Sequence, residues 1–235
     1  MTRKRHCRQR LLLLGTALPL WACTAMAQTT TPPANVLRDS LHKAADALAY
    51  YPDSIDLRLR KARWNMELRE WQNAKNEYDI VLNREPTNVA ALYYRAYCND
   101  RLGRYNFARL DYQNMLTIVP GNFEARLGLA LLNEKDHHYT EALDGINQLV
   151  AAHPDSAVAW AARAGIEQER GMNELAEYDY GEALKRDPDN KDYLLTRADL
   201  RIKLGNYAEA RRDLDLLVTL GTPKAALKEW YGKLK

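Results

Sequence analysis

Five prolines recur at a constant spacing of 34 residues along this chain. They are Pro52, Pro86, Pro120, Pro154 and Pro188. Equal spacing of this kind indicates an internal repeat, and a period of about 20–50 residues is typical of units that stack side by side. With proline at position 32, the units are 55–88, 89–122, 123–156, 157–190 and 191–224, and Thr222 occupies the proline position of the last unit.

Two positions of the repeat hold alanine in every unit. Position 8 is Ala62, Ala96, Ala130, Ala164 and Ala198, and position 20 is Ala74, Ala108, Ala142, Ala176 and Ala210. Because protein interiors are close-packed, ten alanines at two positions predict sites where helices approach closely and a larger side chain would clash. Large apolar residues recur at positions 17, 24 and 28, which is helical spacing. The pattern therefore predicts an all-α protein.

Each unit carries the start and stop signals of two helices. Ser54, Asn88, Asn122, Ser156 and Asn190 directly precede the five units and predict helix N-caps. Gly103, Gly171 and Gly205, at position 15, predict the end of the first helix, because glycine tolerates a left-handed backbone. Proline at position 32 cannot continue the second helix. We therefore expect helix A at positions 1–14 and helix B at about positions 18–31.

At this point the chain resembles the tetratricopeptide repeat family. Unit 2 carries the resemblance in Leu92, Ala96, Leu102-Gly103-Arg104-Tyr105, Ala108, Tyr112 and Pro120, and unit 4 in Trp160, Ala164, Gly171, Ala176, Tyr180 and Pro188. The resemblance covers residues 55–224 and implies a right-handed α-solenoid of five 34-residue helix–turn–helix repeats. The chain departs from the family at position 7 and at position 11, which is usually tyrosine but here is Asn65, Asn99, Asn133, Glu167 and Arg201.

Amphipathic segments flank the five units. Residues 36–54 place apolar side chains on one helical face and align with a helix B, which predicts a partial N-terminal repeat. At the other end, residues 225–235 carry an apolar stripe of Leu227, Trp230, Tyr231 and Leu234. We expect this segment to be a capping helix, because the last unit of a stack would otherwise expose its core face. Residues 28–35 are a polar linker.

Positions 7 and 23 carry opposite charges in four of the five units. The pairs are Lys61 with Glu77, Arg95 with Asp111, Arg163 with Asp179 and Arg197 with Asp213. In unit 3 both charges are absent together, since the two positions are Leu129 and Gly145. Pairing within a unit explains this joint loss, so we expect structural ion pairs between helix A and helix B. Removing one partner of such a pair, if buried, costs about 3–5 kcal/mol.

Residues 1–27 have the parts of an export signal. A basic start is followed by an apolar stretch from Leu11 to Trp21, and Ala25-Met26-Ala27 is an A-x-A cleavage site. We therefore expect a periplasmic or secreted protein. Two alternatives stay open. Leu20-Trp21-Ala22-Cys23 resembles a lipobox, and lipidation at Cys23 would give an outer-membrane lipoprotein. The apolar stretch is also at the short limit for an uncleaved membrane anchor.

Removing residues 1–27 reverses the sign of the net charge. The whole chain has 34 basic and 31 acidic residues, a net charge of +3. Five basic and no acidic residues lie in 1–27, which leaves 29 basic against 31 acidic residues and a net charge of −2. A nucleic-acid-binding surface needs clustered basic residues, so we expect no nucleic acid partner. Cys98 stands at an apolar repeat position, which predicts a small buried hydrophobe.

The resemblance also implies a concave groove, lined by the A helices at positions 2, 5, 9, 12 and 13. Carried onto this sequence, it gives the partner-binding candidates Leu59, Arg63, Tyr93, Tyr97, Arg101, Leu127, Leu131 and Gly165. Leucine and tyrosine at positions not needed for helix packing indicate an interaction surface. Glycine inside a helix costs about 1 kcal/mol relative to alanine, so a close approach at Gly165 is expected. The alternative is that these side chains only pack on one another.

No motif of an enzyme, a cofactor site or a metal site occurs in the sequence. There is no P-loop, G-x-G-x-x-G, nucleophile elbow or H-E-x-x-H. His137-His138 lies at a turn and is interpreted as solvated. We therefore expect no catalytic residues and no cofactor or metal. The expected function is a scaffold that binds another protein or peptide in the bacterial cell envelope, and the alternative is a lipid-anchored factor that assembles envelope complexes. Membrane contact is expected only through the lipid anchor.

Overall fold

The structure is a computed structural model that describes residues 32–234. The expected export signal, its cleavage site and Cys23 lie outside the described residues. The described helices are α1 (Ala34–Tyr50), α2 (Ile55–Glu67), α3 (Trp71–Arg84), α4 (Val89–Arg101), α5 (Tyr105–Ile118), α6 (Phe123–Lys135), α7 (Tyr139–Ala152), α8 (Ala157–Glu169), α9 (Asn173–Arg186), α10 (Lys191–Lys203), α11 (Tyr207–Thr219), the 3₁₀ helix η1 (Lys224–Leu227) and α12 (Lys228–Lys233). Over residues 32–234 the chain forms helices and turns without a β-strand, which confirms the all-α class. Within this range no helix has the length and apolar character of a membrane span.

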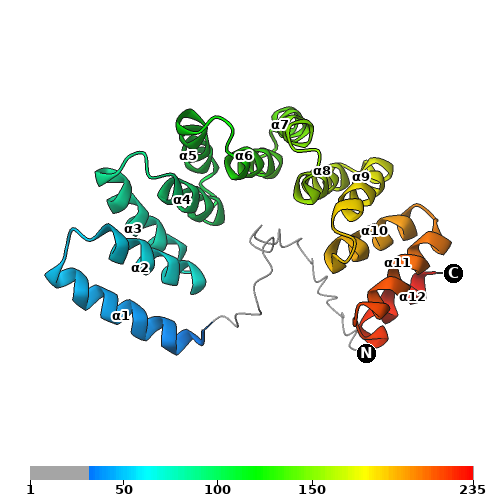
Figure 1. Cartoon of the computed structure of the whole chain (residues 1–235), viewed down its shortest axis with the longest axis horizontal. Coiled ribbons are helices and arrows are strands. Elements are labelled where there is room, and N and C mark those ends of the chain that lie inside the picture. Colours follow the sequence, from blue (N-terminus) through cyan, green and yellow to red (C-terminus); the bar gives the residue numbers. More distant parts are fainter. Residues whose placement is uncertain (1–31, 235) are drawn as a thin grey trace, which may run out of the picture. The chain divides into compact units, whose positions relative to one another are not determined.

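The helices pack in pairs that follow the 34-residue spacing. Helices α2, α4, α6, α8 and α10 are the A helices, and each makes its most extensive contacts with the B helix that follows it. Each B helix then packs against the next A helix, so contacts run from neighbour to neighbour along the solenoid. Figure 1 shows the A helices on the inner side of a curve. The B helices α3, α5, α7, α9 and α11 lie on its outer side.

Side-chain caps start all five A helices, as predicted. The side chains of Ser54, Asn88, Asn122, Ser156 and Asn190 accept hydrogen bonds from the backbone N–H three residues later, at 2.7–3.3 Å. A cap of this kind is worth about 1 kcal/mol, because it satisfies a donor that the helix itself leaves unpaired. The A helices span positions 1–13 and so end one residue earlier than expected. Most B helices span positions 17–30 and so both begin and end one residue earlier than expected.

Position 15 adopts a left-handed backbone in every unit. The predicted glycines have φ of 72° at Gly103, 74° at Gly171 and 79° at Gly205. In units 1 and 3 the same conformation is forced on Arg69 (φ 59°) and His137 (φ 62°). The backbone N–H of position 16 then bonds to the carbonyl of position 11, as from His138 to Asn133 at 2.8 Å. This bond closes the helix end and turns the chain back.

The ten repeated alanines lie at the helix–helix contacts, which confirms their prediction. Nine are fully buried, and Ala130 is 1% exposed. Cys98 is also fully buried, as its apolar repeat position predicts. Burial raises the pKa of its thiol to about 12, so the reactive thiolate form is scarce at neutral pH.

The two ends of the solenoid are closed by helical segments that lie outside the five pairs. Helix α1 packs Leu37, Ala44 and Leu48 against the first complete pair. At the other end, the segment expected to be one helix over residues 225–235 is divided into η1 and α12. A 3₁₀ turn begins after Pro223 without a side-chain cap, and it buries Leu227 against the last pair.

Candidate binding groove

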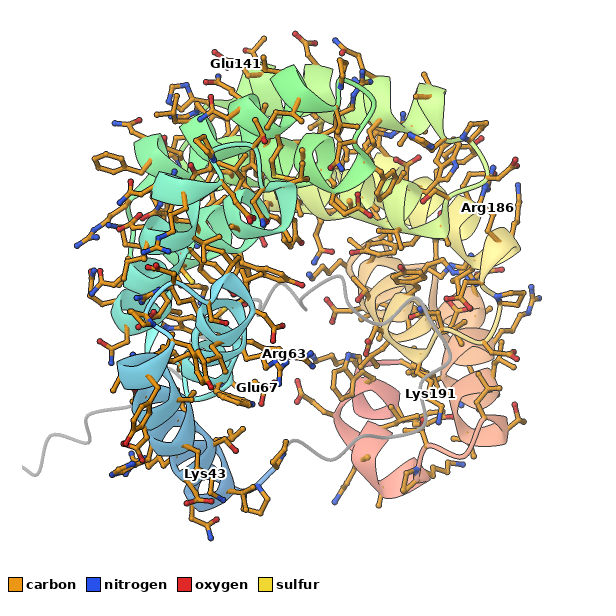
Figure 2. All side chains as sticks on the ribbon, turned by 60° about the vertical axis from the view of Figure 1, so that its left-hand side comes forward. Lys43, Arg63, Glu67, Glu141, Arg186 and Lys191 are labelled. Carbon is orange, nitrogen blue, oxygen red and sulfur yellow. The ribbon has the colours of Figure 1, made fainter. Side chains whose placement is uncertain are left out.

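The A helices carry the candidate groove residues on the inner side of the curve. In Figure 2, Arg63 and Glu67 of α2 point toward this inner side, whereas Glu141 of α7 lies on the outside. Arg63 donates to Glu67 at 3.2 Å, one turn along the same helix.

An aromatic wall forms the part of the groove around α4. The ring of Tyr97 meets the ring of Trp71 edge to face, with centroids 5.7 Å apart. Arg101 lies over the same Trp71 ring, 5.4 Å from its centroid. Aromatic contacts and a cation over an aromatic face each contribute about 1 kcal/mol. The wall is thus held in place before any partner arrives.

One residue predicted to line the groove is buried in the core, and three others are half-buried and pack against it. Leu127 is 2% exposed and packs in the core with Ile146 and Leu149, so its assignment to the binding surface is wrong. Leu59, Tyr93 and Leu131 are half-buried and each packs against a core cluster. The premise that these positions are not needed for helix packing therefore fails for four of the eight candidates.

Tyr93 belongs to a continuous ring cluster that crosses from α3 to α5. It contacts Tyr94 at 5.3 Å and Tyr112 at 6.2 Å between centroids, and Tyr94 stacks on Tyr78 at 5.8 Å. Burial raises the pKa of Tyr93 to about 12, with smaller effects from the neighbouring tyrosines and Glu124. Tyr93 is therefore held by this ring cluster, whereas Tyr97 is held by Trp71.

The candidate groove positions of α8 carry small residues. Ala161, Ala162 and Gly165 are half-buried and carry short or no side chains. A Cβ built on Gly165 would meet only the Tyr180 hydroxyl, at 3.9 Å, so the close approach expected at Gly165 is absent. The close approach occurs at Gly128 of α6 instead, where a Cβ would lie 2.6 Å from Cζ of Tyr112.

Position 9 gives the groove an uncharged centre. On α4, α6 and α8 this position is Tyr97, Leu131 and Gly165, all half-buried. The row ends in opposite charges, with Arg63 on α2 and Asp199 on α10, and each of these pairs with a residue four positions later in its own helix. An occupant that lies along the row would therefore meet apolar surface in the middle and a different charge at each end.

The four predicted helix A to helix B ion pairs are brought together behind this surface. The closest nitrogen–oxygen distances are 2.6 Å for Lys61–Glu77, 2.6 Å for Arg95–Asp111, 2.5 Å for Arg163–Asp179 and 2.7 Å for Arg197–Asp213. The three arginines each use two nitrogens on the two carboxylate oxygens. Such bidentate pairs fix the geometry as well as the charge, so they hold helix A against helix B in units 2, 4 and 5.

Contacts between units were missed by the reasoning from the sequence. Arg95 also donates to Asp79 of the preceding unit at 3.0 Å, and Arg163 donates to Asn147 at 3.2 Å. Tyr231 of the capping segment donates to Asp215 at 2.6 Å. All three acceptors stand at position 25, and their partners stand 16 residues later. This spacing was the signal that would have identified them.

In units 2 and 5, position 11 supplies a donor to the acid of the ion pair. Asn99 donates to Asp111 at 3.4 Å and Arg201 donates to Asp213 at 2.8 Å. In unit 4 the residue is Glu167, 7% exposed, beside Asp179. Burial first, and then the charge of Asp179, raises the pKa of Glu167 to about 7, although Arg163 acts in the opposite direction. A protonated Glu167 can donate to Asp179 as Asn99 and Arg201 do to their acids.

Comparisons with known proteins place these features in a family. Sequence models described as tetratricopeptide repeat match residues 59–123 and 166–226, and residues 101–166. A curated relative, the DnaJ protein P58IPK homolog A of Oryza sativa subsp. japonica, is 27% identical over 75% of this chain and 40% of its own length. The chain thus spans about two fifths of that relative.

Solved structures with the same fold were also found. A tetratricopeptide repeat protein from Parabacteroides merdae has a TM-score of 0.69 at 24% identity, over 85% of this chain and 78% of its own. YrrB, described as a TPR protein with an unusual peptide-binding site, has a TM-score of 0.51 at 16% identity, over 76% of this chain and 92% of its own. At these identities the likeness shows the fold alone.

Proposed function

The chain belongs to the tetratricopeptide repeat family, and on this premise we propose that its concave groove binds a peptide or a helix of another protein. The fold is that of a protein–protein interaction scaffold, and proteins of this family are generally non-catalytic. Within residues 32–234, no group of three His, Cys, Asp or Glu side chains could hold a metal ion. The scaffold character of the family supports recognition of another protein as the function.

The position-9 row carries the proposal. Tyr97, Leu131 and Gly165 present uncharged, half-buried surface on three consecutive A helices. Tyrosine is enriched at the energetic centres of protein interfaces because its ring is large and its hydroxyl can hydrogen-bond. The short side chains of α8, two A helices along from the ring, leave room for a bulky apolar group. An extended peptide or a helix with an apolar centre fits this arrangement.

A double alanine variant tests the groove. Tyr93→Ala with Tyr97→Ala removes the two groove tyrosines and is expected to abolish capture of the partner from extracts of the native host. The matched control is Tyr50→Ala with Tyr51→Ala, because these tyrosines are 82% and 68% exposed outside the groove. Helical content measured by circular dichroism must stay intact in both variants. Capture that is unchanged by loss of the groove tyrosines would remove the proposal.

Location in the bacterial cell envelope is the second part of the proposal, and it is supported by the features of residues 1–27. A cleaved export signal places the groove in the periplasm or outside the cell, and lipidation at Cys23 would anchor it to the outer membrane. Mass spectrometry of the mature N-terminus distinguishes the two routes. A terminus at Gln28 indicates simple cleavage, and an acylated Cys23 indicates the lipid-anchored assembly factor. A mature protein that retains Met1 and residues 2–27 would contradict both.

A further inference from the structure

Two B helices expose apolar pairs at the same repeat positions. Phe107 and Leu110, at positions 19 and 22 of α5, are 63% and 53% exposed. Leu175 and Tyr178, at the same positions of α9, are 54% and 58% exposed. Scattered single apolar residues are normal on a surface, but two pairs in register are a pattern that packing within this chain does not require.

The B helix between them carries acidic residues at the same two positions. These are Glu141 and Asp144 on α7, and both are exposed. Position 19 and position 22 are uncharged asparagines on α3 and the charged pair Glu209 and Arg212 on α11. Helices α5, α7 and α9 therefore form an apolar–acidic–apolar sequence, here called the outer row: Phe107, Leu110, Glu141, Asp144, Leu175 and Tyr178.

The acids of the outer row are not neutralised by this chain. Over residues 32–234, no lysine or arginine forms an ion pair with Glu141 or Asp144. The nearest cationic group to Glu141 is His138, at 3.8 Å, and its charge requires protonation. Figure 2 shows Glu141 on the outside of the curve, away from Arg63 and Glu67 of the groove side. Unpaired carboxylates between two apolar pairs make a surface that a cationic partner would complement.

A polar cavity adjoins the apolar pair of α5. It has a volume of about 210 Å³, lies between α3, α4 and α5, and is lined by Phe107 and Leu110 together with the polar or charged residues Lys75, Asp79, Arg95, Asn99 and Asp111. Its charges are paired, since Asp79 bonds to Lys75 at 2.6 Å and to Arg95 at 3.0 Å. The apolar contact on α5 is therefore supplied by the exposed side chains of Phe107 and Leu110 themselves.

We propose that the outer row binds a basic amphipathic helix of another protein. Apolar side chains near the two ends of that helix pack on the α5 pair and the α9 pair, and lysine or arginine between them faces Glu141 and Asp144. Successive B helices are linked through the A helix between them and do not pack on each other, so α5 and α9 lie farther apart than two packed-helix spacings of about 8–10 Å. Four turns of a helix rise about 22 Å and return a side chain to the same face, so the two anchors are about 14 residues apart or more.

The outer row lies on the B helices, whereas the groove lies on the A helices. Occupation of one does not block the other. The chain can therefore bridge two proteins, one on each side of the solenoid, and the outer row does not depend on the groove proposal.

A designed peptide tests the outer row. The probe is a fluorescein-labelled helix of about 22 residues, with leucine pairs about 14 residues (four turns) apart and lysines between them on the same face. Its binding to protein purified from cells that express all 235 residues is measured by fluorescence anisotropy. We expect saturable binding that falls at high salt, because the lysine contacts are screened.

Two variants and one control locate the binding. Phe107→Ser with Leu175→Ser removes one apolar anchor on each side, and Glu141→Lys with Asp144→Lys reverses the charge between them. Each is expected to weaken binding about tenfold or more. Leu216→Ser, 39% exposed on α11, controls for loss of an exposed leucine elsewhere and should leave binding unchanged. All the substituted side chains are exposed, so circular dichroism should show intact helices.

Four outcomes overturn the proposal. The first is that the lysine probe does not bind, and the second is that a probe with glutamate in place of lysine binds equally well. The third is that both double variants bind the lysine probe as the natural chain does. The fourth is that the protein self-associates and that Phe107→Ser with Leu175→Ser abolishes this self-association. The last outcome, read by light scattering, would identify the outer row as a contact between two copies of this chain.

Discussion

Replacement of Glu167 by glutamine is expected to stabilise the protein at alkaline pH and to leave its stability unchanged in acid. Glu167 is 7% exposed, and one of its carboxylate oxygens is buried without a hydrogen-bond partner. Burial, and then the charge of Asp179, raises its pKa to about 7 from the ordinary value of 4.5. Glutamine has the shape of the protonated acid and donates to Asp179 at every pH, as Asn99 does to Asp111.

The sign and the size follow from proton linkage. Between pH 4.5 and pH 7 the folded protein holds a proton on Glu167 that the unfolded chain releases, so stability falls as pH rises through this window. A tenfold change in proton affinity is worth about 1.4 kcal/mol, which gives a total of about 3 kcal/mol. Glu167→Gln removes this loss. Its advantage over the natural chain is about zero at low pH and about 2–3 kcal/mol above the folded pKa.

Denaturant unfolding at about pH 4 and about pH 8.5, followed by circular dichroism, measures this difference. Subtracting the two proteins at each pH cancels the titration of all other groups. Glu169→Gln, an exposed neighbour on the same helix, is the control for loss of one negative charge. A stability difference between Glu167→Gln and the natural chain that does not change with pH would refute the reasoning.

Three further predictions concern glycine sites and an ion pair. Gly128→Ala should destabilise the protein by about 1–2 kcal/mol, because the added Cβ would overlap the buried ring of Tyr112. Gly165→Ala should stabilise it by about 0.5–1 kcal/mol, because there the added Cβ meets no close neighbour and alanine favours the helix. Thermal unfolding compares the two variants, and equal shifts of Tm would contradict the packing described at Gly128 and Gly165. His137→Gly should raise the unfolding free energy by about 0.5–1 kcal/mol, since φ is 62° there, and a loss of stability would be the contrary result. Asp179→Ala should lower the unfolding free energy by about 3 kcal/mol, because Arg163 loses a bidentate partner. Urea denaturation measures this change, and a loss below about 1 kcal/mol would show that the pair is dispensable.

The sequence was sufficient for features that repeat in every unit or depend on adjacent residues. An N-cap such as Asn88 bonds three residues along the chain, so its role is visible locally. The alanines at positions 8 and 20 recur because each unit meets its neighbours in the same way. Gly103 could be interpreted because only glycine adopts a left-handed backbone without strain.

Contacts that differ from unit to unit were harder to predict. Tyr112 packs on Gly128, whereas the equivalent Tyr78 stacks on Tyr94. The same contact between a B helix and the next A helix is therefore made by different residues in different units. The burial of Leu127 depends on Ile146 of the facing helix, and the repeat pattern alone does not encode that distance. Glu167 was visible as a departure from the family, but its protonation depends on burial and on Asp179, which only the packed structure shows.

Site-specific photo-cross-linking in the native host tests the central claim that the inner side of the solenoid holds a partner protein. A photoreactive residue is placed at Leu131, in the centre of the position-9 row, or at Asn83, an exposed residue on the outer helix α3. The account predicts a discrete cross-linked protein from position 131 and none from position 83. Cross-linking from position 83 alone, or from neither position, would contradict it.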